Sequence, residues 1–319
     1  MTRPRVSHRQ VSVVVCTRNR SDLLRRCLGR LAELDPKPLE IVVVDQSDGN
    51  ESGVLARGWM AGDPSRRWIP TATRGASRAR NLGIREAEGE IVALTDDDCL
   101  VRRDWVGAVV RTFNLHPEIA AVTGGSQPEG SEEADPRALA AATWHPENPR
   151  VFQSPVDPSL VGASFNLSFR KSWAEKVGGF DPDLGPGGRF RGAEDTDFIH
   201  RILHSGGTIR YEPEVVVTHL PWRDPGTQSM VDREYGHGIA AWALRRLTQG
   251  DLFPAKVALM VVLSQGRRAL GGILRRDESA WRTGKAYLSG LGTGLLSWLL
   301  ASASPRSRED RPREVKSSA

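Results

Sequence analysis

Short apolar runs alternate with amphipathic stretches between residues 11 and 219. Val11 to Cys16 and Ile41 to Val44 are runs rich in β-branched residues, and between them apolar residues recur at helical spacing from residue 24 to residue 34, after Ser21. The runs predict buried strands, and the spacing predicts an amphipathic helix with Ser21 as its N-cap. Tandem strand–loop–helix units favour a parallel sheet with right-handed crossovers, so the pattern predicts an α/β fold.

The same alternation continues along the chain. We expect further strands near Arg67 to Thr71, Ile91 to Leu94, Ile119 to Thr123, Ser164 to Arg170 and Val215 to Val217. We expect helices over Gly75 to Gly89, Asp104 to Leu115 and Glu194 to Gly206. Residues 125–160 are rich in Pro, Ala and Glu without clear periodicity, and they are expected to form an irregular excursion over the site.

The pattern becomes purely helical from about Met230. Ala286 to Ala303 has no charged residue over 18 positions, which reaches the length of a membrane span but includes three Gly, three Ser and one Thr. A span, an interfacial or buried hairpin, and a soluble oligomerisation helix all remain open. We expect a domain over 1–228, a helical and membrane-associated region over 229–304, and a disordered tail over 305–319.

Composition and charge limit the classes of protein to which the chain can belong. With 39% hydrophobic and 26% charged residues in 319, the chain is neither disordered throughout nor a polytopic membrane protein. The net charge is +5, and residues 245–285 hold nine Lys or Arg against three acids, a local excess of six. This segment predicts an anionic partner, lipid or nucleic acid. Few aromatic residues lie among these arginines, so nucleic acid is not the expected partner.

The cysteines and the N-terminus indicate the compartment. Cys16, Cys27 and Cys99 have no paired spacing, so the sequence predicts neither a disulfide framework nor a zinc site. A reducing compartment is the simpler inference. The first ten residues are basic but lack the apolar region of a signal peptide, so we expect the main domain in the cytoplasm.

Three groups of polar residues are candidates for chemistry. Asp96, Asp97 and Asp98 follow an apolar run, which places them at the carboxyl edge of the sheet. Adjacent carboxylates suit Mg²⁺ or Mn²⁺, although a solvated acidic turn explains them too. Two arginines in the helix that opens at Gly75 can hold phosphate or face solvent. The acids from Glu194 onward can be functional or can cap a helix.

The order and spacing of these motifs resemble those of the family 2 glycosyltransferases, which have the GT-A nucleotide-diphospho-sugar transferase fold. The resemblance covers about residues 10 to 222. It is carried by six segments: Val11 to Arg20, Ile41 to Ser47, Gly75 to Gly83, Asp96 to Asp98, Gly179 to Asp181 and Glu194 to Asp197. It implies a GT-A (Rossmann-like) α/β catalytic domain over 1–228, with a mostly parallel central sheet flanked by helices and a C-terminal helical extension.

The resemblance also implies roles for single residues. The nucleotide base would be held by Thr17, Asn19 and Asp45, and an Asp acceptor suits the imide N–H of uracil or thymine. Asp96 and Asp98 would contact the ribose and the metal that bridges the diphosphate, and Asp97 is grouped with the donor-binding residues without a role of its own. Arg78 and Arg80 are candidates for diphosphate or ribose contact, or are solvent-facing. His219 would complete the metal shell, or is a plain hydrogen-bonding residue.

Catalysis is assigned to the Glu194–Asp195 pair by the same resemblance. Inversion needs a carboxylate opposite the leaving group, and Asp195 fits the role of base better than Glu194, whose charge would raise the pKa of its neighbour. Asp197 caps the helix or pairs with Arg201. The predicted function is a metal-dependent (Mn²⁺ or Mg²⁺) inverting transfer from a UDP- or dTDP-sugar to a lipid-linked, polysaccharide or other cell-envelope acceptor, at the inner face of the plasma membrane.

Two alternatives compete with this prediction. A nucleotidylyltransferase of similar fold would start with a glycine-rich loop containing Lys, whereas the first strand here runs into Thr17-Arg18-Asn19-Arg20. A protein that binds nucleic acid or another anionic surface through its basic C-terminal helices, with a non-catalytic GT-A domain, would show a steep salt dependence and no need of Asp96 or Asp98.

Overall fold

The computed structural model describes residues 5–129, 146–220 and 227–303. The chain forms two compact units: a sheet unit, residues 1–182 and 194–225, and a helical unit, residues 183–193 and 226–319. Part of the excursion expected over 125–160 and the tail expected over 305–319 lie outside the described residues.

The sheet unit contains all the described strands. They are β1 Val11–Thr17, β2 Glu40–Asp45, β3 Arg66–Pro70, β4 Ile91–Asp96, β5 Cys99–Val101, β6 Ala121–Pro128, β7 Arg150–Phe152, β8 Asn166–Arg170 and β9 Ile209–His219. Its helices are α1 Ser21–Ala32, α2 Glu51–Met60, α3 Ala76–Glu86, α4 Trp105–Leu115, α6 Lys171–Val177 and α7 Glu194–His204, with 3-10 turns η1 His8–Gln10 and η2 Pro158–Leu160. The α/β prediction is confirmed. The three-residue strands β5 and β7 are too short to show a periodicity in the sequence.

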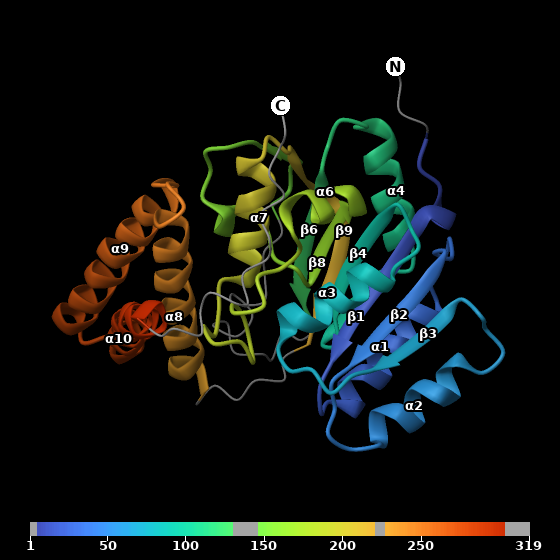
Figure 1. Ribbon diagram of the computed structural model, residues 1–319, viewed down its shortest axis with the longest axis horizontal. Helices are drawn as coiled ribbons and strands as arrows, with labels where there is room; N and C mark the ends of the chain where they lie inside the picture. The colour runs from blue at the N-terminus through green and yellow to red at the C-terminus, as the bar shows by residue number, and fades with distance from the viewer. Residues whose placement is uncertain (1–4, 130–145, 221–226, 304–319) are drawn as a thin grey trace. The chain divides into compact units, whose positions relative to one another are not determined.

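The sheet is mixed. Its strand order is β3-β2-β1-β4-β8-β6-β9-β5, with β7 on β9 (Figure 1). The first four strands are parallel neighbours, whereas β8 is antiparallel to both β4 and β6, and β5 is antiparallel to β9. A parallel neighbour needs a long crossover, and α1, α2 and α3 supply one after each of the first three strands. Only Asp97 and Asp98 separate β4 from β5.

Side chains of the central strands alternate between two cores. Val13 and Val15 of β1 lie in one core with residues of α1 and α4, while Val14 lies in the other with residues of α3 and α7. Successive side chains of a strand point to opposite faces of a sheet, so a continuous apolar run is what a strand covered on both faces requires. This burial fixes where each strand ends and therefore where the polar residues after it emerge.

The helical unit consists of α8 Gln228–Leu247, α9 Phe253–Arg275 and α10 Glu278–Ala303 together with residues 183–193. Within it, Arg245 Nη1 lies 3.2 Å from Asp183 Oδ2, and the Phe190 ring packs against the rings of His237 and Trp298. The predicted C-terminal helical extension is confirmed. By length and composition alone, α9 and α10 are each apolar enough to cross a membrane.

Packing of α3 on the sheet provides a stability test. A Cβ added at Gly83 would lie 2.3 Å from Val14 Cγ1 and 3.3 Å from Val44 Cγ2, whereas one added at Gly29 in α1 would meet nothing within 4 Å. We expect Gly83→Ala to lower the free energy of unfolding by ~1–3 kcal/mol. Gly29→Ala should raise it by ~0.5–1 kcal/mol, because alanine loses less backbone entropy in a helix. Urea unfolding of both variants checks this, and equal shifts would contradict it.

Candidate active site

The predicted site residues gather where neighbouring strands end. Thr17 at the end of β1 pairs in register with Asp45 at the end of β2, and Asp96 at the end of β4 pairs with Cys16 of β1. His219 ends β9 and pairs with Cys99, the first residue of β5. The expectation that polar groups meet at one edge of the sheet therefore matches the register of the strands.

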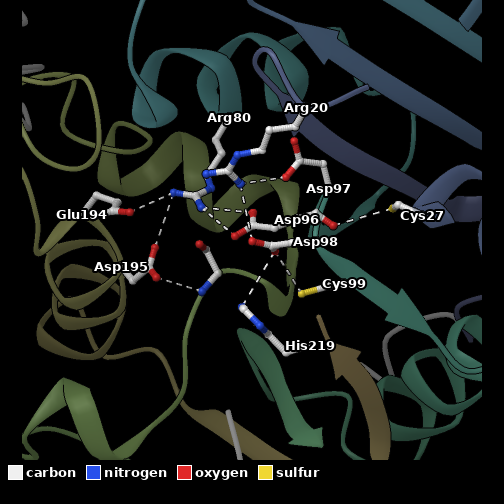
Figure 2. Close-up of polar contacts among 11 residues, drawn as sticks. Arg20, Cys27, Arg80, Asp96, Asp97, Asp98, Cys99, Glu194, Asp195 and His219 are labelled. Atoms are coloured by element: carbon white, nitrogen blue, oxygen red, sulfur yellow. Dashed lines mark hydrogen bonds and ion pairs between the residues drawn. The ribbon is translucent and has the colours of Figure 1, made fainter. Parts of the chain in front are cut away.

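A buried arginine joins the acids of β4 to those of α7 (Figure 2). The Arg80 side chain is 7% exposed, and its Nη2 donates to Asp96 Oδ1 at 3.2 Å. Its Nη1 donates to Glu194 Oε1 at 3.2 Å and lies 3.6 Å from Asp195 Oδ1. Burial acts to lower the pKa of Arg80, but the surrounding carboxylates outweigh it and hold the pKa well above its ordinary value. Arg80 is therefore a charged centre of the site and not a solvent-facing residue of α3.

The middle acid of the triplet is held inside the protein. Asp97 Oδ2 accepts a 2.7 Å hydrogen bond from Thr17 Oγ1, and its Oδ1 accepts one of 3.1 Å from Arg20 Nη1. Burial raises the pKa of Asp97 to about 7, against the lowering effect of Arg20 and Thr17. No role for Arg20 is predicted from the sequence. Its position three residues after Thr17, just beyond the end of β1, could have indicated that it belongs to the site. Asp97 and Arg20 hold the end of β1 against the turn after β4.

The third acid shares Arg20 with Asp97, since Arg20 Nη1 donates to Asp98 Oδ2 at 3.4 Å, and its other oxygen faces two further groups. His219 Nε2 lies 3.8 Å from Asp98 Oδ1, and Cys99 Sγ lies 3.6 Å from the same oxygen. The Phe165 ring meets the imidazole edge-on at 5.5 Å. A carboxylate oxygen and an imidazole nitrogen at this spacing suit a divalent cation, so Asp98 and His219 fit the predicted metal. Asp96 turns both carboxylate oxygens towards Arg80 instead, at 3.2 and 3.5 Å.

The two acids that open α7 differ in their surroundings. Asp195 Oδ2 accepts a 3.2 Å hydrogen bond from the Ser164 backbone N–H, while its Oδ1 lies in the ion pair with Arg80. Burial, followed by the Asp195 carboxylate, raises the pKa of Glu194 to about 7, although Arg80 acts in the opposite direction. Asp197 pairs with Arg201 at 2.8 Å, as one of the two predicted alternatives for it requires. Glu194 and Asp195 are therefore the acids of this helix start that lie beside Arg80.

The residues predicted to hold the nucleotide base lie at the ends of β1 and β2, where Thr17 pairs with Asp45 and the Asn19 N–H donates to Ser47 Oγ at 2.8 Å. Asp45 Oδ1 accepts from the Ser47 backbone N–H at 2.9 Å and Oδ2 accepts from Trp68 Nε1 at 3.2 Å, so the carboxylate is fixed in place. Asn19 adopts a φ of +54° and pairs through its side chain with Asp48. Sequence reasoning missed Trp68, since nothing in the spacing shows that its indole reaches Asp45.

The second predicted arginine lies apart from the acids in the described part of the chain. Arg78 Nη1 donates to the carbonyl oxygen of Pro182 at 2.8 Å and to that of Arg74 at 3.3 Å. Two residues along a helix place side chains on different faces, so Arg78 and Arg80 point different ways. Arg80 is the arginine of α3 that the structure brings to the acids.

The pKa of Glu194 makes stability depend on pH. Because its folded-state pKa is about 7 and its ordinary value is 4.5, the folded state binds more protons than the unfolded state between these values. Stability contributed by this carboxyl is therefore present at low pH and is lost as pH rises towards 7. We expect Glu194→Gln to gain stability relative to the parent protein as pH rises from about 5 to about 8 in urea unfolding.

Glu33→Gln, at an exposed position, is the control. A difference between Glu194→Gln and parent that is constant with pH would refute this.

The sequence of this chain is similar to those of several known proteins. A pre-mycofactocin glycosyltransferase of Mycobacterium tuberculosis is 29% identical over 91% of this chain, and the chain spans 54% of that relative's length. The succinoglycan biosynthesis protein ExoM of Rhizobium meliloti is 26% identical over 81% of this chain and 87% of its own length. The chain thus spans about half of the mycobacterial relative but most of ExoM.

A solved structure and a family model agree with the sheet described above. The mannosyltransferase PcManGT from Pyrobaculum calidifontis, in complex with GDP-Man and Mn²⁺, superposes with a TM-score of 0.62 at 22% identity, over 90% of this chain and 87% of its own. This likeness confirms the GT-A fold. The model of glycosyl transferase family 2 matches residues 12–178, which is more than half of the chain. The chain therefore belongs to glycosyl transferase family 2.

Proposed function

We propose that this chain is a metal-dependent, inverting glycosyltransferase that moves a sugar from a nucleoside-diphosphate donor to a hydroxyl of a lipid-linked or polysaccharide acceptor. The observation that carries the proposal is the single cluster in which Arg80 contacts Asp96, on the donor side, and the Glu194–Asp195 pair. A transferase of this class needs a group that holds the diphosphate and a base close to one another. Family membership supports the same reaction.

The donor side is assigned to the ends of β1, β2 and β4. Thr17, Asn19 and Asp45 are proposed to hold the nucleotide, with the fixed Asp45 carboxylate accepting from the base. An acceptor there suits the imide of uracil or thymine, so UDP- and dTDP-sugars stay the favoured donors. The likeness to PcManGT, which was solved with GDP-Man, adds GDP-sugars to the donors that should be tested.

Asp98 and His219 are the residues proposed to hold the divalent ion, with Asp96 contributing to the donor from its place beside Arg80. When bound, the ion would neutralise the charge that builds on the leaving nucleoside diphosphate. Arg80 adds a positive charge that does not depend on the ion, because its guanidinium stays protonated. The Mn²⁺ in the PcManGT complex supports a divalent ion without fixing which one this chain uses.

Asp195 is the proposed base. Its Oδ2 is held by the Ser164 N–H, and among the described residues its Oδ1 has no hydrogen-bond partner besides the ion pair with Arg80. The carboxylate is thus oriented, with Oδ1 buried beside Arg80, and the side chain as a whole keeps 25% of its surface exposed to an incoming hydroxyl. The carboxylate takes the proton as the acceptor attacks the anomeric carbon opposite the leaving group, which inverts the configuration. Glu194, with its raised pKa, keeps the local negative charge low.

Asp195→Asn tests the base. Because the amide cannot accept the proton, we expect the turnover rate to fall by about 1,000-fold, within the usual range for loss of a general base. The amide keeps the shape of the side chain, so donor binding should remain. Turnover is measured with the donor that gives the largest Mn²⁺-dependent thermal shift in a panel of nucleotide sugars, and donor binding by calorimetry. Loss of donor binding with turnover retained would overturn the assignment.

The helical unit is proposed to contact the inner face of the plasma membrane. Large apolar side chains are exposed along α9, with Leu263 at 52%, Leu270 at 58% and Leu274 at 76%. The basic residues of 245–285 belong to the same unit, so an apolar face and positive charge occur together. This combination is typical of helices that lie in an anionic lipid interface. It also suits a lipid-linked acceptor.

Membrane contact is tested on the full chain with vesicles. Burial of each leucine contributes about 1.5–3 kcal/mol, so Leu270→Glu with Leu274→Glu should weaken binding to phosphatidylglycerol vesicles by about tenfold or more. Leu115→Glu, at a leucine of α4 that is 76% exposed, is the matched control and should bind as the parent does. Co-sedimentation measures both. Equal binding of the double variant and the control would contradict a contact through α9.

A further inference from the structure

Three potential ligand atoms of different elements lie together beside the acidic triplet. They are Asp98 Oδ1, Cys99 Sγ and His219 Nε2, and all lie within 4.8 Å of one another. The oxygen is 3.6 Å from the sulfur and 3.8 Å from the nitrogen (Figure 2). The sequence predicts no zinc site, because its three cysteines have no paired spacing.

Backbone pairing fixes this arrangement. Cys99 and His219 are direct partners in the antiparallel pair of β5 and β9, which places their side chains on the same face of the sheet. The next residue, Leu220, donates its N–H to the Asp98 carbonyl oxygen at 2.8 Å. The three side chains are therefore held by strand register and not by a loop.

Two of the three spacings are close to those of a tetrahedral metal site, and the third, from Cys99 Sγ to His219 Nε2, is within 4.8 Å. Bonds of about 2.3 Å to sulfur and about 2.0 Å to oxygen or nitrogen, at tetrahedral angles, separate an oxygen from a sulfur ligand by about 3.5 Å and an oxygen from a nitrogen ligand by about 3.3 Å. The observed 3.6 and 3.8 Å differ from these values by a few tenths of an ångström, within the reach of side-chain rotation. Three protein ligands leave the fourth position open.

Sulfur changes which cation the set prefers. Mg²⁺ and Mn²⁺ favour oxygen ligands, whereas a thiolate with imidazole and carboxylate favours Zn²⁺ and its thiophilic relatives Cd²⁺ and Co²⁺. Cys99 is fully buried. A thiol binds such a cation as thiolate, so one proton is released to solvent for each cation bound.

We propose that Asp98, Cys99 and His219 form a binding site for a thiophilic divalent cation of the zinc class, in which Cys99 is a sulfur ligand. The proposal rests on the proposed function in that it shares Asp98 and His219 with the ion that serves the donor. Zn²⁺ at this site occupies the place of Mn²⁺ and competes with it. Cys99 thereby makes the site bind thiophilic cations such as Zn²⁺ in preference to Mg²⁺ and Mn²⁺.

Cadmium and cobalt report sulfur ligation directly. Titration of either ion into the metal-free full-length protein should produce a sulfur-to-metal charge-transfer band in the parent protein, and Cys99→Ser should remove it. Cys27→Ser is the matched control, because Cys27 is also a buried thiol, with its Sγ 3.6 Å from the Asp96 carbonyl oxygen, but lies outside the three-ligand set. Zn²⁺ affinity, measured by competition, should fall by about tenfold or more in Cys99→Ser and much less in Cys27→Ser.

The outcomes separate this proposal from the proposed function. A band that persists in Cys99→Ser, disappears equally in Cys27→Ser or never forms in the parent protein overturns sulfur ligation. If Cys99→Ser fails to fold, X-ray absorption at the zinc edge of the parent protein decides instead, since one sulfur neighbour at about 2.3 Å supports the site and only oxygen and nitrogen neighbours refute it. None of these readouts needs a sugar donor, so a band without any transfer in Mn²⁺ would count against the proposed function alone.

Discussion

The buried guanidinium of Arg80 allows three carboxylates to lie close together in this protein. Asp96, Glu194 and Asp195 are near enough to repel one another, and Arg80 forms an ion pair with each of them. A buried charge is costly unless it is paired, and a guanidinium has enough donors in a fixed fork to satisfy several carboxylates at once. Arg80 therefore fixes the start of α7 against the end of β4. The distance between Asp96, on the proposed donor side, and the proposed base Asp195 depends on that contact.

The sequence predicts the position of these acids well, because their place follows from burial. A strand covered on both faces is mostly apolar up to the sheet edge, so the first acid after Leu94, which is Asp96, marks the edge. The role of Arg80 is harder to predict. Its spacing along α3 is compatible with solvent, with phosphate or with carboxylates, and the choice is made by Glu194 and Asp195, more than a hundred residues later.

The reversal of the chain after β4 explains why the sequence does not predict that His219 lies beside Cys99. Two residues join β4 to β5, so β5 leaves the parallel pattern and pairs antiparallel with β9. That register brings His219 beside Asp98 and Cys99, although 120 residues separate the histidine from the cysteine. Metal motifs read from a sequence depend on short, regular spacing, and strand pairing leaves no such signal. The position of the Cys99 sulfur next to His219 is consequently apparent only in the folded chain.

The loop that precedes α7 in the chain, residues 183–193, belongs to the helical unit. Residue 193 belongs to that unit and residue 194 to the sheet unit, so the peptide bond before Glu194 is one of three places where the chain passes from one unit to the other. Upstream of this bond, Phe190 packs on His237 and Trp298, and Gly192 lies so close to Gly238 that a Cβ on Gly238 would come within 2.3 Å of the Gly192 carbonyl carbon. The loop is thus part of the helical packing. Because a well-packed interior leaves little room for extra volume, any side chain larger than glycine at residue 238 would displace this loop within the helical unit.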